Sequence, residues 1–239
     1  MSSTRRATLP SISATFDACV FSTGSPLPVM VRGQQPSSPK RAGSDASHYF
    51  DDDPDAVSER RTVELTLPDT SMQLITDRGV FAHGQIDQGS KLLLLRAPAA
   101  APEGDLLDLG CGTGAIALTM ARRSPAATVW AVDVNRRARE LCAENAEANG
   151  IGNVRVVMPD EVPDDVRMTT IWSNPAIRIG KPALHAMLVH WLDRLAPDGT
   201  ATLVVHKHLG SDSLQRWLIE QHFPTTRLTS NHGYRLLHA

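Results

Sequence analysis

A short apolar run that breaks into alternate glycines limits the possible folds of this chain more than any other feature. Residues 106–109 read Leu-Leu-Asp-Leu, glycines follow at 110, 112 and 114, and an apolar pattern resumes at Ala115. Glycines at this spacing let the backbone turn tightly and approach a ligand closely. A helix that begins near Ala115 would point its unpaired N–H groups and its positive end toward the loop. The pattern predicts a strand, a nucleotide-binding loop and a helix.

Asp133 adds a second indication about the ligand, because it follows the next apolar run, residues 128–132. A carboxylate at the end of that strand can accept hydrogen bonds from both hydroxyl groups of a ribose. The ligand should therefore contain a nucleoside.

The glycine loop also fits the dinucleotide fingerprint G-x-G-x-x-G/A, so a nicotinamide or flavin enzyme is an alternative. Two features argue against that alternative. Asp108 puts a carboxylate where a pyrophosphate would approach, whereas the ammonium group of an aminoacyl sulfonium would be attracted there. In addition, Ser173-Asn174-Pro175 follows another apolar run, and a dehydrogenase has no general need for such an element.

Composition indicates one sizeable core and a reducing, cytoplasmic environment. The chain has 239 residues, of which 41% are hydrophobic, and its three cysteines show no C-x-x-C spacing. No apolar run approaches the ~20 residues that a membrane-spanning helix needs.

A net charge of −2 gives no general attraction to nucleic acid, so an RNA partner would require a local basic patch. Most histidines lie in residues 185–238 without a companion carboxylate or cysteine cluster, so no metal site is predicted.

The first part of the chain differs in character from the rest. Residues 1–47 are rich in proline, serine and glycine and lack sustained periodicity, which predicts a disordered tail. Arg5-Arg6 resembles the start of an export signal, but Pro10 and Asp17 interrupt any apolar core, so export is not expected. We expect residues 48–239 to form one domain, in which 48–102 supply a hairpin and pocket segment and 103–239 the main sheet.

From Asp105 onward, strand and helix patterns alternate, which predicts an α/β fold with a parallel sheet covered on both faces. Strands are expected near residues 106–109, 128–133, 154–157, 168–173 and 200–205. Helices are expected near residues 115–123, 136–149, 182–195 and 212–221. Gly150 and Gly199 should lie just beyond two of the helix ends.

Two hairpins flank this alternation. Residues 63–67 and 72–75 alternate in polarity around Pro68-Asp69-Thr70-Ser71, which predicts an N-terminal β-hairpin, and a short helix is expected at 91–95. Residues 225–230 and 234–237 surround Asn231-His232-Gly233 and predict two strands joined by a tight turn. This second hairpin would add an antiparallel strand to the sheet.

These motifs together resemble those of class I S-adenosylmethionine-dependent methyltransferases. The likeness rests on Asp108-x-Gly110-x-Gly112-x-Gly114, on Asp133, and on Asn174-Pro175 after the fourth strand. More narrowly, residues 76–81 (Thr-Asp-Arg-Gly-Val-Phe), residues 87–94 (Asp-x-Gly-Ser-x-Leu-Leu-Leu) and Gly233-Tyr234-Arg235 resemble the small-domain methyltransferase family, which includes ribosomal RNA guanine-N2 methyltransferases. The resemblance implies a Rossmann-like, mostly parallel seven-stranded sheet with an antiparallel C-terminal strand and an N-terminal β-hairpin.

The resemblance also implies methyl transfer from S-adenosylmethionine to an exocyclic amine, with guanine in small-subunit ribosomal RNA as the expected target. The implied catalytic positions are Asn174 and Pro175, where the Asn174 oxygen and a nearby main-chain carbonyl would accept hydrogen bonds from the amine. Residues 81–90 would wall the donor pocket. The implied donor-binding residues are Phe81, Asp108, Gly110, Cys111, Gly112, Gly114, Asp133, Val134 and Asp160. The implied substrate-binding residues are Ile177, Arg178, Lys181 and Lys207.

The chain departs from the family pattern next to Asn174-Pro175. The pattern usually continues with a second proline and an aromatic residue, whereas this chain has Ala176 and Ile177. An aromatic side chain there would stack on the target base, which is worth about 1–3 kcal/mol per base, and Phe81 could take over that role. The departure leaves two alternatives open: methylation of a small molecule or protein side chain, and a donor-binding module without catalysis.

Overall fold

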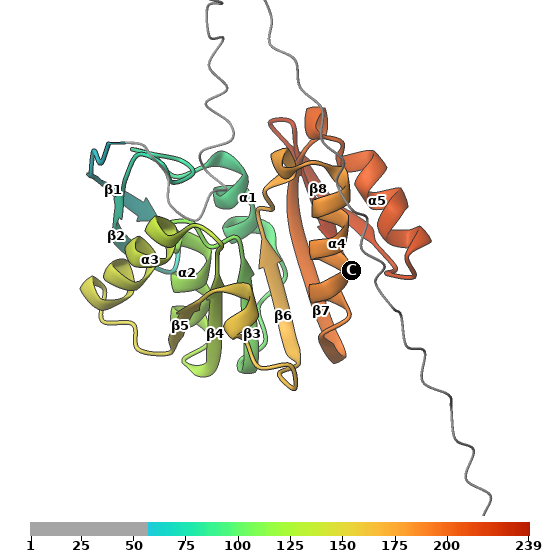
Figure 1. Cartoon of the computed structure of the whole chain (residues 1–239), viewed down its shortest axis with the longest axis horizontal. Coiled ribbons are helices and arrows are strands. Elements are labelled where there is room, and N and C mark those ends of the chain that lie inside the picture. Colours follow the sequence, from blue (N-terminus) through green and yellow to red (C-terminus); the bar gives the residue numbers. More distant parts are fainter. Residues whose placement is uncertain (1–56) are drawn as a thin grey trace, which may run out of the picture. The chain divides into compact units, whose positions relative to one another are not determined.

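The computed structural model describes residues 57–239, so the tail predicted at residues 1–47 lies outside the described residues. A seven-stranded sheet forms the centre of this part of the chain, with the strand order β5-β4-β3-β6-β7-β9-β8 (Figure 1). Five strands run parallel to their neighbours: β3 (Glu103–Leu109), β4 (Ala126–Val132), β5 (Val154–Val157), β6 (Met168–Ser173) and β7 (Leu195–His206). β9 (Tyr234–His238) pairs antiparallel with both β7 and β8 (Thr226–Asn231). The α/β class and the antiparallel C-terminal strand predicted from the sequence are confirmed.

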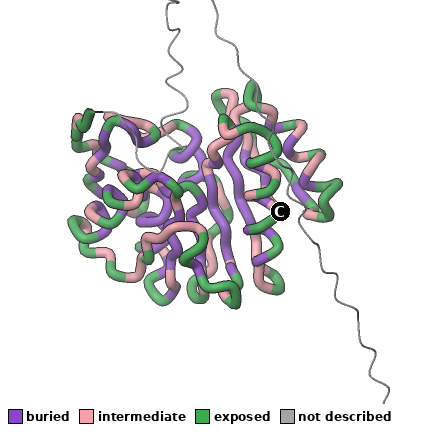
Figure 2. Tube along the Cα trace, in the orientation of Figure 1, coloured by how far each residue is buried: buried purple, intermediate pink, exposed green. Residues whose placement is uncertain are grey.

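Helices cover both faces of this sheet, as a parallel sheet with two apolar faces requires. One face carries α1 (Gln88–Arg96), α2 (Ala115–Arg123) and α3 (Arg136–Ala148), and the other carries α4 (Lys181–Leu192) and α5 (Ser211–Glu220). Single 3₁₀ turns follow β5, β6 and β7: η1 (Pro159–Glu161), η2 (Ile177–Ile179) and η3 (Lys207–Leu209). Successive residues of β3 enter opposite cores, Leu106 beneath α2 and Leu107 beneath α4. Figure 2 shows the resulting buried band along the central strands.

The predicted N-terminal hairpin is also present, as a separate two-stranded sheet. β1 (Arg61–Thr66) pairs antiparallel with β2 (Ser71–Thr76), and Leu65 lies opposite Met72. Leu65, Met72 and Leu74 are buried in the core that α2 and α3 share. The hairpin therefore extends the core on the face covered by α1, α2 and α3, and it does not extend the main sheet.

A buried amide joins this hairpin to the glycine loop. Asn145 of α3 accepts a hydrogen bond from the Ile75 N–H at 2.7 Å. Its Nδ2 donates to the carbonyl oxygens of Ile75 and Thr113, both at 2.9 Å. Because buried peptide groups need hydrogen-bond partners, this one side chain satisfies backbone groups of the hairpin and of the loop at the same time.

The boundary between α4 and β7 differs from the prediction. α4 ends at Leu192, and β7 already begins at Leu195 instead of near residue 200. A bulge explains the difference, because the pairing of β7 with β6 skips the residues between Leu195 and Thr200. Gly199 therefore lies within β7, in this bulge, and not beyond a helix end. A Cβ there would sit 2.6 Å from the Met168 carbonyl oxygen. Gly150 does follow α3 as predicted, with a φ of 65°.

Candidate active site

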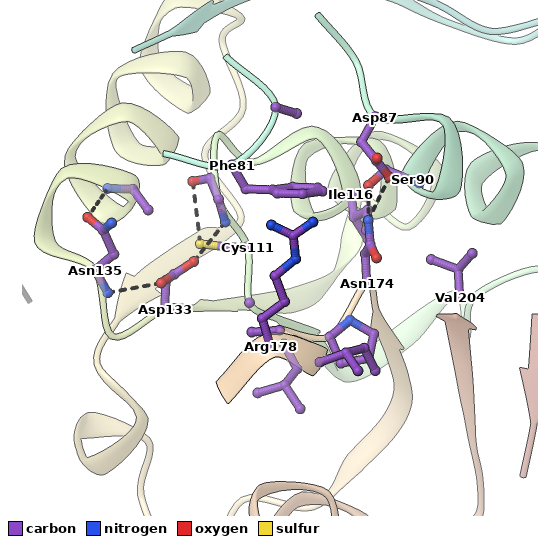
Figure 3. A pocket seen from close by; sticks show the side chains of 18 of the residues that line it. Phe81, Asp87, Ser90, Cys111, Ile116, Asp133, Asn135, Asn174, Arg178 and Val204 are labelled. Atoms are coloured by element: carbon purple, nitrogen blue, oxygen red, sulfur yellow. Dashed lines mark hydrogen bonds between the residues drawn. The ribbon is translucent and has the colours of Figure 1, made fainter. Parts of the chain in front are cut away.

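A cavity of about 1110 Å³ lies at the carboxyl ends of β3, β4, β6 and β7 (Figure 3). Open α/β sheets bind ligands at this edge, where the loops that follow neighbouring parallel strands come together. The cavity has room for a nucleoside and a second small group, since typical ligand sites occupy about 300–1,000 Å³. Its wall is formed by residues 80–90 after the N-terminal hairpin, by the glycine loop, by η2 and by residues of β7 and β9.

Most of the site residues predicted from the sequence line this cavity, although they come from distant parts of the chain. These are Phe81, Gly110, Cys111, Gly112, Asp133, Val134, Asn174, Pro175, Ile177 and Arg178. The exposed fractions of Phe81 (53%) and Val134 (43%) are high for apolar side chains, which leaves two apolar surfaces open to a ligand. Arg178 points into the same space (Figure 3).

The other predicted residues do not line the cavity. These are Asp108, Gly114, Asp160, Lys181 and Lys207. Asp160 belongs to η1, whose first residue, Pro159, does reach the wall. Lys181 begins α4, and Lys207 lines a separate recess of about 190 Å³ beside the turn between β8 and β9.

The glycine loop has the backbone that its sequence predicts. Gly110, Gly112 and Gly114 have φ angles of 79°, 53° and 89°, in the left-handed region that favours glycine. The N–H groups of Gly110 and Cys111 both donate to the Val132 carbonyl, at 2.8 Å and 3.0 Å. A Cβ at Gly112 would meet no atom within 4 Å, so this glycine leaves open space in the wall for a ligand.

Gly114 is required for packing rather than for an open wall. A Cβ at this position would lie 2.8 Å from both Cys142 Sγ and Leu118 Cδ1. Gly114→Ala is therefore expected to lower the free energy of unfolding by about 3 kcal/mol, through overpacking and left-handed strain. Urea unfolding would measure the change. Gly152→Ala is the matched control, because a Cβ at Gly152 meets open space without left-handed strain, and equal losses in the two variants would contradict this account.

Asp133 connects β4 to the glycine loop. Its Oδ2 accepts the Gly112 N–H and its Oδ1 accepts the Asn135 N–H, both at 2.9 Å. Burial raises the pKa of Asp133, although these two N–H groups favour the ionised form. Asn135 in turn donates through Nδ2 to the Gly79 carbonyl at 2.9 Å. The carboxylate thus holds the loop in shape and also lines the cavity.

Asp108 lies behind the loop and is fully buried. Its Oδ2 accepts the Ala117 N–H in the first turn of α2 at 2.8 Å. Its Oδ1 has no hydrogen-bond partner among the described residues. Burial, with a smaller contribution from the charge of Asp133, raises the pKa of Asp108 to about 8. Asp108 therefore supports the start of α2 and is mostly protonated at neutral pH.

Asn174 follows β6 directly and is held by its side-chain amide, while the residue before it is bonded to β3. The preceding residue, Ser173, donates from its hydroxyl to the Leu109 carbonyl at 2.6 Å. The Asn174 Nδ2 donates to Asp87 Oδ2 at 2.7 Å and to Ser90 Oγ at 3.1 Å (Figure 3). Both amide hydrogens are thereby used, and the amide oxygen is available to a ligand in the cavity.

Several residues of the wall were not predicted to be site residues from the sequence. Tyr234 and His206 meet edge to face, with ring centroids 4.8 Å apart, and His208 lies 5.2 Å from His206. Trp191 of α4 also lines the cavity. The Gly233-Tyr234-Arg235 motif was the one sequence signal for this side of the cavity, and nothing near the histidines indicated that they would join it.

Among residues 57–239, each helix is too short or too polar to span a membrane. Within the same residues, no group of three histidine, cysteine, aspartate or glutamate side chains is placed to hold a metal ion.

Comparison with known proteins gives a consistent set of relatives. Residues 71–238 match the sequence family described as methyltransferase small domain. The chain is 33% identical over 197 residues to the uncharacterized protein YbxB of Bacillus subtilis, covering 81% of this chain and 98% of that protein. It is also 33% identical over 193 residues to ribosomal RNA small subunit methyltransferase C of Pseudomonas aeruginosa, covering 78% of this chain and 56% of that protein.

This chain is also similar in fold to a solved structure. The 16S rRNA N2 methyltransferase RsmC of T. thermophilus, in complex with AdoMet and guanosine, superposes with a TM-score of 0.66 at 25% identity. The superposition covers 77% of this chain and 51% of that chain. The present chain thus spans about half the length of the methyltransferase C relatives and nearly all of YbxB.

Proposed function

Because the chain belongs to the methyltransferase small domain family, we propose that it methylates the N2 amine of a guanine in small-subunit ribosomal RNA. S-adenosylmethionine is the proposed methyl donor. One observation carries the proposal: the Asn174 amide uses its hydrogens on Asp87 and Ser90, so that its oxygen is left for an amine in the cavity. The relatives named as ribosomal RNA methyltransferases, and the RsmC complex with AdoMet and guanosine, support the choice of substrate.

The donor side of the cavity fits S-adenosylmethionine. The left-handed turns at Gly110 and Gly112 leave the wall open beside the backbone, where the methionine part would lie. We assign the Asp133 carboxylate, which lines the cavity, to the ribose hydroxyl groups. The exposed apolar surface of Val134 would cover the adenine ring, Phe81 would lie near the transferred methyl group, and Asp160 next to the wall is the proposed partner of the adenine amine.

Asp108 acts on this site from behind it. Because Asp108 accepts the Ala117 N–H and does not line the cavity, we assign it to the shape of the loop and the start of α2. The Asp108 Oδ1 is buried without a hydrogen-bond partner among the described residues, which disfavours the ionised carboxylate. The ammonium group of a bound donor nearby would favour ionisation.

The chain's own residues contribute orientation more than acid–base chemistry. A nucleobase amine is a poor nucleophile because its lone pair is delocalised into the ring, so the site must favour a tetrahedral nitrogen. Hydrogen bonds from the amine to the Asn174 oxygen would do so. The Pro175 carbonyl is the second proposed acceptor, since it accepts the Ile177 N–H at 2.8 Å and keeps a second lone pair. S-adenosylmethionine, when bound, supplies the methyl group and leaves as a neutral thioether.

The target side has no aromatic residue in η2, where Ala176 and Ile177 take the place of the family's proline and aromatic. Phe81 offers an aromatic face across the cavity, and Arg178 offers a positive charge to the nucleic acid (Figure 3). Lys181 and Lys207 lie outside the cavity wall, so we assign them to more distant parts of a bound RNA. A ribosomal RNA substrate places the proposed reaction in the cytoplasm.

Methyl transfer from a labelled donor tests this proposal. The full chain would be incubated with methyl-labelled S-adenosylmethionine and with small ribosomal subunits or 16S rRNA that lack guanine-N2 methylation, followed by nucleoside mass spectrometry. We expect label in N2-methylguanosine at one position. Label only in protein or in small molecules would reject the RNA proposal and favour the alternatives raised by Ala176 and Ile177. Calorimetry that shows NAD binding without S-adenosylmethionine binding would revive the dehydrogenase alternative.

A further inference from the structure

The amide of Asn174 is fixed by the first turn of a helix that lies far from it in the sequence. Asp87 caps α1, because its Oδ2 accepts the Ser90 N–H at 2.9 Å. The same Oδ2 accepts the Asn174 Nδ2 at 2.7 Å, and Ser90 Oγ accepts it at 3.1 Å. Two residues of one helix start therefore receive both hydrogens of the catalytic amide.

We propose that Asp87 and Ser90 are positioning residues that keep the Asn174 oxygen toward the cavity, so that the site selects an amine as the methyl acceptor. This inference rests on the proposed function, for which Asn174 must accept a hydrogen bond from the target. A side-chain amide has an oxygen and a nitrogen of nearly equal size, and a free amide can present either one to a ligand. The nitrogen would suit a carbonyl or a ring nitrogen; the oxygen suits an N–H group.

Asp87 removes this choice by its chemistry. An ionised carboxylate only accepts hydrogen bonds, so the atom 2.7 Å from Asp87 Oδ2 must be the nitrogen of Asn174. A rotated amide would bring two acceptor oxygens together and leave the carboxylate without a partner. Charge-assisted hydrogen bonds are also stronger than neutral ones, which increases the preference for the observed orientation.

Tyr234 holds Asp87 from its other side. The Tyr234 hydroxyl donates to Asp87 Oδ1 at 3.5 Å. The ring approaches Gly89 so closely that a Cβ there would lie 2.7 Å from Tyr234 Cε1. Burial raises the pKa of Tyr234, so its hydroxyl keeps the proton that it donates. Both oxygens of Asp87 thus have partners, which limits rotation of the carboxylate.

Two substitutions at position 87 separate the cap of α1 from the orientation of the amide. Serine is a good helix N-cap, but its side chain is too short to reach Asn174. Asparagine keeps an oxygen where Asp87 Oδ2 accepts its hydrogen bonds. We expect Asp87→Ser to lower kcat by about 10- to 100-fold, because small misplacements of orienting groups reduce rates by such factors. The Kd of the donor should change little, and Asp87→Asn should restore kcat to within about threefold of the original protein.

A second measurement follows the amide itself and needs no substrate. In ¹⁵N-labelled protein, the side-chain NH₂ signals of Asn174 are identified by their absence in Asn174→Asp. We expect Asp87→Ser to shift both signals and speed their exchange with water, and Ser90→Ala to affect mainly one of them. Asp69→Ser is the control, because it removes a carboxylate of the hairpin turn that pairs with Arg123 of α2. This substitution should alter neither these signals nor kcat.

The outcomes distinguish this inference from the proposed function. Unchanged amide signals in Asp87→Ser would overturn the inference, as would a loss of kcat that Asp87→Asn does not restore. If the original protein methylates no guanine, the proposed function fails. The amide signals would still decide whether Asp87 and Ser90 fix the orientation of Asn174.

Discussion

Asn174→Ala is expected to lower kcat for methyl transfer by about 10²- to 10³-fold, the usual effect of removing one orienting hydrogen-bond partner from a transition state. The Asn174 oxygen is the acceptor that the amine would meet in the cavity, and alanine offers none. The Kd of S-adenosylmethionine should stay within about threefold, because the donor side consists of the glycine loop and Asp133. Single-turnover methylation and calorimetry would measure the two quantities separately.

Asn231→Ala is the matched control for this substitution. Asn231 is an exposed residue at the end of β8 and does not line the main cavity, so kcat should not change. If Asn174→Ala binds the donor and still methylates guanine at the original rate, the target amine is not held by Asn174.

Asp108→Asn is expected to remove most of the pH dependence of stability between about pH 4 and pH 8. In this window the folded protein keeps a proton on Asp108, whose pKa is about 8, while the unfolded chain has released it. Folding therefore takes up a proton, and the free energy of unfolding falls as the pH rises, by about 5 kcal/mol across the window. Asparagine cannot ionise, so the variant should show a much smaller slope.

Urea unfolding at several pH values between 5 and 8 would measure this slope. A smaller slope of the same sign should remain in Asp108→Asn, because burial also raises the pKa of Asp133. Asp69→Asn is the control: the pKa of Asp69 is lowered by its hydrogen bond with Arg123, so any contribution from Asp69 lies below this window. Equal slopes in the original protein and Asp108→Asn would show that Asp108 ionises normally in the folded state.

The parts of the fold that local patterns determine were predicted well. The alternation of apolar runs and helix patterns gave the order of strands and helices, and tight turns marked both hairpins. The end of α4 was placed too late, because the apolar pattern continues past Leu192 and the bulge at Pro197-Asp198-Gly199 depends on pairing with β6. The start of α1 was placed at residue 91 instead of Gln88, although Asp87 and Ser90 already contain the signal for the cap.

The site was predictable to the extent that it lies at strand ends. The glycine loop, Asp133 and Asn174 follow parallel strands and so meet at one edge of the sheet. Asp108 lies behind the wall because residues of β3 alternate between the two faces, which places it on the side of Leu106 beneath α2. The contacts of Tyr234 with Asp87 and of Asp87 with Asn174 join segments far apart in the chain, and no local pattern specifies such contacts.

The Asn145 amide has a consequence for any attempt to move this site into another protein. It bonds Ile75 in the hairpin and Thr113 in the glycine loop, so the loop is shaped partly by a strand pair that does not line the cavity. The family match begins at residue 71, after β1 has ended, yet Leu65 of β1 is buried in the shared core. A graft that starts at β2 would carry every residue of the cavity wall. It would still lack β1, one of the two strands of the hairpin that supports the glycine loop.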